Sequence, residues 1–326
     1  YFTDDPDYDA TSMRKADSYK ELTKEDITED YLREFFWSNE SEFTALKRIY
    51  GLDESHSIYD SLTFINNVNS NTDVVTMHLI MVANTSIGDI GPSCNIDKIR
   101  MTSELKGIAT ALNIGYKETV IAGNNYSRSQ VMSAVNTISP AEDDIVIFAY
   151  SGHGFRWKDQ ESDWPQLDLR ANPYELSTIE NSLGLVEVYN LLKAKGARLN
   201  IILGDCCNSN IGYNEISSAT FLSMKRHGNF DIGQMQRLFL QSEGSIIATA
   251  ASPGETAKCN NAYGGFFTSS FIQALQTEVS YFNTGKADWE KVIYGTHEAA
   301  SYKTAPAVCP RCTPQNCIYN STISYN

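Results

Sequence analysis

The sequence predicts an α/β fold in which a mostly parallel central sheet is covered by helices on both faces. Short apolar segments recur from residue 74 to residue 250, as buried parallel strands do. Segments with apolar residues at helical spacing separate them. Reactive side chains follow directly after two of the apolar segments, where open α/β sheets place their binding crevices.

The expected elements alternate along the chain. Strands are predicted at 74–83, 118–122, 144–150, 200–203 and 245–250. Helices are predicted at 94–113, after Ser127, before Gly196 and at 266–278. Ser127 with Gln130 three residues later forms a capping box, and glycine at position 196 suits the end of a helix. We expect a polar loop at 155–172.

The first 72 residues differ in pattern from the rest. Residues 1–17 are acidic and polar, and a helical pattern begins with Tyr31, Leu32, Phe35 and Phe36. We expect an N-terminal helical extension, 1–72, that forms an accessory layer on the sheet; a prosegment or lid is the alternative. The polar stretch 66–73 predicts the boundary, and the main domain is expected at 73–326.

The amino-acid composition of the chain favours some classes of binding partner over others. The chain has 40 acidic and 26 basic residues and a net charge of -14, which argues against nucleic-acid binding and favours cationic substrates, or serves solubility alone. No apolar segment approaches the roughly 20 residues of a membrane helix. We expect a monomer. If Tyr1 follows a removed leader, we expect a secreted or periplasmic protein, and otherwise a cytoplasmic one.

Two predicted strands end in chemically reactive residues. The segment 200–203 leads through Asp205 to Cys206 and Cys207, and the segment 144–150 leads through Ser151 to His153. Neighbouring parallel strands would deliver a thiol and an imidazole to the same edge of the sheet. The sequence therefore predicts a Cys/His dyad.

These motifs carry a family resemblance. Residues 151–154 (SGHG) and 205–207 (DCC) resemble the histidine and cysteine motifs of caspase-like peptidases (peptidase C14), most closely those of metacaspases. Residues 94–97 (CNID) resemble the C-x-x-D segment of the first metacaspase helix, and 251–257, 264–268 and 313–315 resemble segments late in that fold. The resemblance spans roughly 74–316 and implies a three-layer caspase-like sandwich.

The resemblance also implies catalytic roles. Cys207 matches the nucleophile, His153 would activate the thiol or protonate the leaving amine, and the N–H groups of Gly154 and Cys207 would form the oxyanion hole. Cys206 is the competing nucleophile, although we expect it to be a small buried hydrophobe. A catalytically inactive scaffold or regulatory domain is the alternative function. An α/β-hydrolase is disfavoured because the G-x-S-x-G elbow is absent.

In metacaspases, the residues that match Cys94, Asp97, Ser151 and Asp205 line the pocket for the substrate side chain before the cut. Two carboxylates there would select arginine or lysine and disfavour aspartate. The alternatives are that Asp97 is a first-turn helix carboxylate and that Asp205 is a strand-end cap. The predicted activity is thus an endopeptidase that cleaves after basic residues through an acyl-enzyme. Self-processing, if it occurs, is expected after Lys225 or Arg226.

We expect no cofactor, although two segments contain residues that could bind a metal. The loop after His153 lies where many metacaspases bind calcium, and its weak calcium candidates are Asp159, Asp163 and Asp168; tryptophans and a proline interrupt the loop, which favours a solvated acidic segment. Seven cysteines leave at least one without an internal partner. For Cys309, Cys312 and Cys317 we expect a disulfide or core packing rather than zinc, because no fourth ligand is evident.

One motif departs from the family pattern. Residues 208–210 (NSN) follow the nucleophile position, where metacaspases usually have histidine, serine and glycine. The other histidines have no motif around them, and we expect structural roles for them: His56, His78, His227 and His297.

Overall fold

The computed structural model describes residues 75–326 except 88, 171, 173 and 211–229. The predicted N-terminal extension, 1–72, therefore lies outside the described residues. The same holds for the predicted self-cleavage positions, Lys225 and Arg226, and for His56 and His227.

A mostly parallel sheet forms the centre of the described structure. Its strand order is β11-β8-β7-β3-β1-β2. The pairs among β1, β2, β3, β7 and β8 are parallel, whereas β11 and β12 run antiparallel to β8. The bounds are β1 Thr76–Ala83, β2 Gly115–Ala122, β3 Ile145–Ser151, β7 Leu199–Asp205, β8 Ser242–Thr249, β11 Ile318–Ser321 and β12 Ser324–Tyr325. This confirms the predicted fold class and places β3 and β7, the two strands with reactive ends, side by side.

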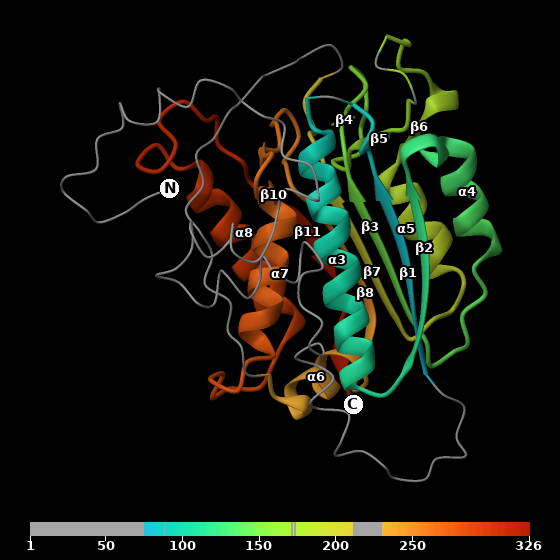
Figure 1. The fold of residues 1–326 in the computed structure, drawn as a ribbon, viewed down its shortest axis with the longest axis vertical. Coiled ribbons are helices and arrows are strands. Elements are labelled where there is room, and N and C mark those ends of the chain that lie inside the picture. Colours follow the sequence, from blue (N-terminus) through green and yellow to red (C-terminus); the bar gives the residue numbers. More distant parts are fainter. Residues whose placement is uncertain (1–74, 88, 171, 173, 211–229) are drawn as a thin grey trace, which may run out of the picture. The chain divides into compact units, whose positions relative to one another are not determined.

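Helices cover both faces of the sheet (Figure 1). One face carries α3, α7 and α8, with α6 near the end of that layer, and the other carries α4 and α5. The bounds are α3 Gly91–Ala111, α4 Arg128–Thr137, α5 Leu185–Lys193, α6 Ile232–Phe239, α7 Phe266–Glu278 and α8 Trp289–Thr304. The Ser127 side chain accepts a hydrogen bond from Gln130 N, so the predicted start of α4 is confirmed.

The core follows from strand alternation, because successive side chains of a strand point to opposite faces. In β1, Leu79 and Met81 join the apolar cluster under α3, α7 and α8. Ile80 and Val82 join the cluster under α4 and α5. Both faces of the strand are buried, which explains why its sequence is a continuous apolar segment rather than an alternating one.

Several short elements escaped the sequence pattern. Part of the predicted loop 155–172 belongs to a three-stranded sheet of β4 Gly154–Phe155, β5 Gln166–Asp168 and β6 Ser182–Gly184. A hairpin of β9 Cys259–Asn260 and β10 Gly264–Gly265 precedes α7, and short 3-10 turns lie at Gly123–Asn125 and Ile179–Asn181. Strands of two or three residues are too short to show alternation, so the loop prediction is wrong there.

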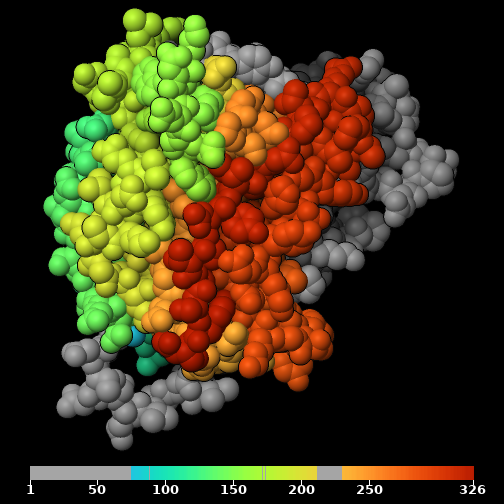
Figure 2. All heavy atoms as spheres, turned by 180° about the vertical axis from the view of Figure 1, so that it is seen from behind, coloured from blue at the N-terminus to red at the C-terminus, as the bar shows by residue number. Residues whose placement is uncertain are grey.

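The C-terminal segment lies along the surface opposite to the view of Figure 1, where Figure 2 shows it in red between the yellow and orange parts of the chain. Near its start, Cys309 and Cys312 form a disulfide, which is one of the two predicted alternatives. Cys317 is free and buried. His78 pairs with Asp144 in the core at 2.9 Å, a structural role as expected.

Candidate active site

The ends of β3 and β7 continue side by side beyond the regular strands. Ser151 pairs with Asp205, and Arg156 forms a bridge with Asn210; each pair is separated by 54 positions in the sequence. The same separation relates His153 to Cys207, so this register places the imidazole residue opposite the thiol residue. The strand ends therefore bring together the two residues that the sequence predicts as a dyad.

The two adjacent cysteines differ in access. Cys206 is 1% exposed, and burial raises the pKa of its thiol well above the ordinary value. Cys207 is only partly buried, and its Sγ lies 3.8 Å from the carbonyl oxygen of Ala257. Since a nucleophile needs both access and a thiolate, the geometry favours Cys207 over Cys206.

Gly154 lies directly against the cysteine segment. A Cβ at this position would lie 2.5 Å from the carbonyl oxygen of Cys207 and 2.7 Å from Cys206 Sγ, so no larger residue fits without displacement. Asp168 N donates to His153 O at 3.0 Å, which makes Gly154 and Leu167 a non-hydrogen-bonded pair of the β4–β5 ladder. The Gly154 N–H therefore points away from β5, as an oxyanion donor would require.

The main chain of His153 is fixed from the other side by two buried tyrosines. Tyr150 donates its hydroxyl to His153 O at 2.6 Å, and the hydroxyls of Tyr126 and Tyr150 lie 2.8 Å apart. Burial raises the pKa of both phenols well above the ordinary value, so both stay protonated. No sequence motif pointed to these tyrosines, although Tyr150 ends a predicted strand and Tyr126 directly precedes Ser127.

Two carboxylates meet beneath the strand ends. Asp97 of α3 is 1% exposed and Asp205 of β7 is 7% exposed. Ser151 Oγ donates to Asp97 Oδ2 at 2.7 Å, and Gly265 N donates to both carboxylate oxygens of Asp97 at 2.9 and 3.0 Å. Thr268 donates from N and from Oγ1 to Asp205 Oδ2, each at 2.8 Å. We refer to Asp97 and Asp205 as the acid pair.

The acid pair lies at the N-terminus of α7. Gly265 is the N-cap residue of this helix and Thr268 lies in its first turn, so the carboxylates accept from amides that have no partner within the helix. A Cβ at Gly265 would lie 2.0 Å from Asp205 Oδ2 and 3.0 Å from Asp97 Oδ2. One glycine segment therefore contacts both carboxylates. The sequence identified 264–268 only as a family-like motif, without this contact.

Burial dominates the electrostatics of the acid pair. Burial, and next the charge of Asp205, raise the pKa of Asp97 to about 8. Burial raises the pKa of Asp205 to about 6, against the hydrogen bonds from Thr268. Lys303 of α8 is a buried cation near the pair: burial lowers its pKa to about 7, opposed by the charge of Asp205, and its Nζ lies 2.7 Å from Ser270 Oγ.

The other two residues predicted for the pocket lie in the same region. Ser151 bonds to Asp97, as described above. Cys94 is 3% exposed, and burial, followed by the charge of Asp97, raises the pKa of its thiol well above the ordinary value. The structure thus gathers all four predicted residues around one buried acidic centre.

The alternative that Asp97 is a first-turn carboxylate is wrong. Helix α3 begins at Gly91, three residues earlier than predicted, and has no acidic residue in its first turn. Proline at position 92 suits the first turn and moves the start upstream. Asp205 does act as a cap, but for the distant helix α7 rather than for its own strand end.

A model of the caspase domain family matches residues 92–307, a range that holds both strand ends and the acid pair. The chain belongs to the caspase domain family. This is a family of cysteine peptidases, so the fold and the paired motifs agree with a peptidase domain. No curated protein matches the chain.

Among solved structures, the caspase domain is similar to the crystal structure of protein GSU0716 from Geobacter sulfurreducens. The sequences are 16% identical, the match covers 76% of this chain and 92% of the other, and the TM-score is 0.43.

The caspase domain does not assemble the weak calcium candidates into a site. The carboxylate of Asp168 is buried and accepts from Arg170 Nε at 2.8 and 3.0 Å. Among the residues that the structure describes, no three His, Cys, Asp or Glu side chains lie together as metal ligands. The donor set at Asp159, Asp163 and Asp168 therefore does not fit calcium, because the one buried carboxylate is already neutralised.

An open pocket of about 210 Å³ lies beside the segment that follows Cys207. Its lining is rich in hydroxyl groups and backbone: Ser209, Asn210, Gly254, Glu255, Thr256, Thr313 and Pro314. Within the described part of the caspase domain, no helix is both long and apolar enough to span a membrane.

Proposed function

We propose that this caspase domain is a cysteine endopeptidase of the metacaspase branch that cleaves after arginine or lysine. The register that sets His153 opposite Cys207 supports the chemistry. The acid pair supports the specificity, because two buried carboxylates lie beneath the same strand ends.

The reaction follows from the positions of the thiol and the imidazole. The Cys207 thiolate attacks the scissile carbonyl carbon, and the C–N bond breaks as His153 delivers a proton to the leaving amine. The resulting thioester is then attacked by water, whose proton passes to His153, and the acid product leaves as the thiolate reforms. The N–H groups of Gly154 and Cys207 would stabilise the oxyanion in both steps.

One carboxylate oxygen of Asp205 is available to a substrate cation, and this supports the proposed specificity. In the described residues, both hydrogen bonds to Asp205 end on Oδ2, which leaves Oδ1 as an acceptor for a substrate cation. A guanidinium or ammonium bound there gains a charge-assisted hydrogen bond in a desolvated setting. An aspartate side chain would place a further acidic group beside the pair and offer no cation to Asp205, which is unfavourable.

The first experiment is a positional peptide library that varies only the residue before the cut, assayed with wild type and with Cys207→Ala. We expect cleavage after arginine and lysine by the wild type and none by the variant. A preference for aspartate or for uncharged residues would contradict the acidic-pocket proposal. A folded wild type that cleaves no peptide and is not labelled by an arginine peptide with a thiol-reactive group would favour the inactive scaffold.

A further inference from the structure

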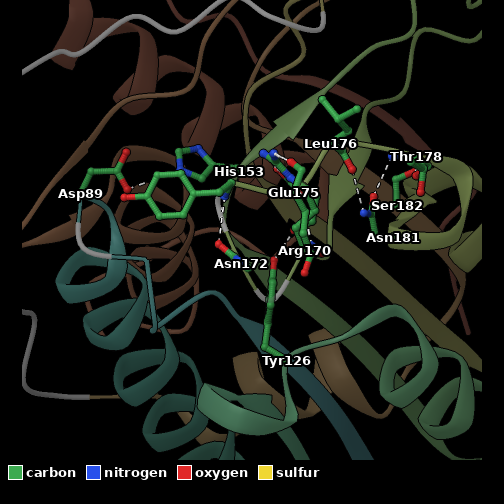
Figure 3. Close-up of polar contacts among 12 residues, drawn as sticks. Asp89, Tyr126, His153, Arg170, Asn172, Glu175, Leu176, Thr178, Asn181 and Ser182 are labelled. Atoms are coloured by element: carbon green, nitrogen blue, oxygen red, sulfur yellow. Dashed lines mark hydrogen bonds and ion pairs between the residues drawn. The ribbon is translucent and has the colours of Figure 1, made fainter.

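We propose that Asp89 is a positioning residue for His153, so that the site works as a carboxylate, imidazole and thiol in series. This inference rests on the proposed cysteine peptidase function. Asp89 Oδ1 lies 3.5 Å from His153 Nε2, and Figure 3 shows the carboxylate facing the imidazole ring. No sequence pattern pointed to this residue, because it lies 64 positions before the histidine in an irregular segment.

The segment that carries Asp89 is anchored at both ends. Asn84 N donates to Ser151 O at 2.9 Å, which ties the segment to the end of β3. Thr85 Oγ1 accepts from Gly123 N at 3.1 Å, and a Cβ at Gly91 would lie 2.7 Å from Thr85 O. Asp89 itself precedes Ile90, the N-cap residue of α3, so its carboxylate lies near the positive end of a 21-residue helix.

The hydrogen bonds described so far fix the main chain of His153 but do not orient its imidazole ring. Its carbonyl oxygen accepts from Tyr150 and Asp168, which fixes the main chain. Among the charged and titratable neighbours, Asp168 is neutralised by Arg170, and Cys207 is opposite in register. Among the described residues, Asp89 is the carboxylate that faces the imidazole; its Oδ1 also accepts from Ile90 N at 2.9 Å.

The contact with Asp89 gives the two ring nitrogens of His153 different roles. Because Asp89 Oδ1 lies on the Nε2 side of the ring, we assign Nδ1 as the nitrogen that takes the proton from Cys207 Sγ. The proton moves from sulfur to Nδ1, which leaves a thiolate and an imidazolium; the carboxylate stays ionised and stabilises that imidazolium. Both side chains of the contact are accessible, 32% for His153 and 65% for Asp89, so the stabilisation is modest and sensitive to salt.

The test uses Asp89→Asn, which keeps the shape and removes the charge, with Asp143→Asn as the control. Asp143 is an exposed carboxylate before β3, at the opposite end of the strand from the site. The first measurement is the rate at which a small alkylating reagent modifies Cys207, followed by peptide mass as a function of pH. We expect Asp89→Asn to slow alkylation about fivefold near neutral pH. The two rates should converge where every free thiol is ionised.

The second measurement is kcat/KM for an arginine peptide. We expect a loss of about fivefold in Asp89→Asn, carried by kcat with KM unchanged, a movement of the alkaline limb to lower pH, and a smaller effect at high salt. Asp143→Asn should match the wild type. Equal alkylation rates in Asp89→Asn and wild type, or an equal loss in Asp143→Asn, would overturn the inference. If the wild type cleaves no peptide, the proposed function fails, whereas alkylation still tests Asp89.

Discussion

The dyad and the acid pair lie at the ends of the same two strands, yet their surroundings are opposite. His153 has a side chain that is 32% exposed, and Cys207 is partly exposed. Asp97 and Asp205 are almost wholly buried and held by hydrogen bonds from Ser151 and from α7. The reacting groups must meet a substrate backbone, whereas the recognising groups gain strength from the absence of water.

The difference has a structural consequence as well. The acid pair satisfies amides at the start of α7, so it supports the fold in addition to any substrate contact. The side chains of His153 and Cys207 do not cap a helix of the described structure in this way. Changes in the dyad should therefore affect chemistry alone, while changes in the acid pair should affect both recognition and stability.

Replacement of the nucleophile should have the largest effect. We expect Cys207→Ala to lower kcat/KM by at least about a thousandfold with an unchanged melting temperature, because the thiolate forms the covalent bond. Cys206→Ala should keep most of the activity and lose about 1 kcal/mol or more of stability, because Cys206 is a buried core residue. A dead Cys206→Ala beside an active Cys207→Ala would reverse the assignment.

Removal of one charge from the acid pair should come next. Asp205→Asn can still accept hydrogen bonds from Thr268 but cannot pair with a guanidinium, so we expect kcat/KM for arginine peptides to fall roughly a hundredfold or more. Thr268→Val is the matched control, since it loses a hydrogen bond to the same carboxylate without a change of charge. An equal loss in both variants would mean that Asp205 acts only as a cap.

Taken per pH unit, the pH dependence of stability should show the smallest effect of the three. The pKa of Asp97 is raised from 3.8 to about 8 in the folded state, so its contribution to stability is present below pH 3.8 and is lost as pH rises towards 8. We expect the difference in unfolding free energy, wild type minus Asp97→Asn, to fall with pH in this window by at most about 1.4 kcal/mol per unit.

Chemical unfolding of both proteins at a series of pH values measures this difference. Lys303, whose pKa is lowered to about 7, contributes a slope of opposite sign that is present in both proteins. A difference that is constant across the window would contradict the buried, protonated state of Asp97.

The sequence predicts the order of the five parallel strands and of α3, α4, α5 and α7, and it brings the reactive residues to one edge, but it did not predict α6 or α8. Short continuous apolar segments between helical patterns are typical of buried strands in a covered sheet, and residues after neighbouring parallel strands meet at one edge. Helix α7 was predicted with the bounds that the structure has, because Gly264 and Gly265 and the apolar pattern mark its start. Local pattern was sufficient for these features.

Tertiary structure alone decided which groups touch the dyad and the acid pair. Asp89 approaches His153 across 64 positions, and Gly265 approaches Asp97 across 168. No local pattern encodes such contacts, since each depends on where an anchored segment or a helix start arrives in space. The same holds for the burial that raises the pKa of both acids, because desolvation depends on every element packed around them.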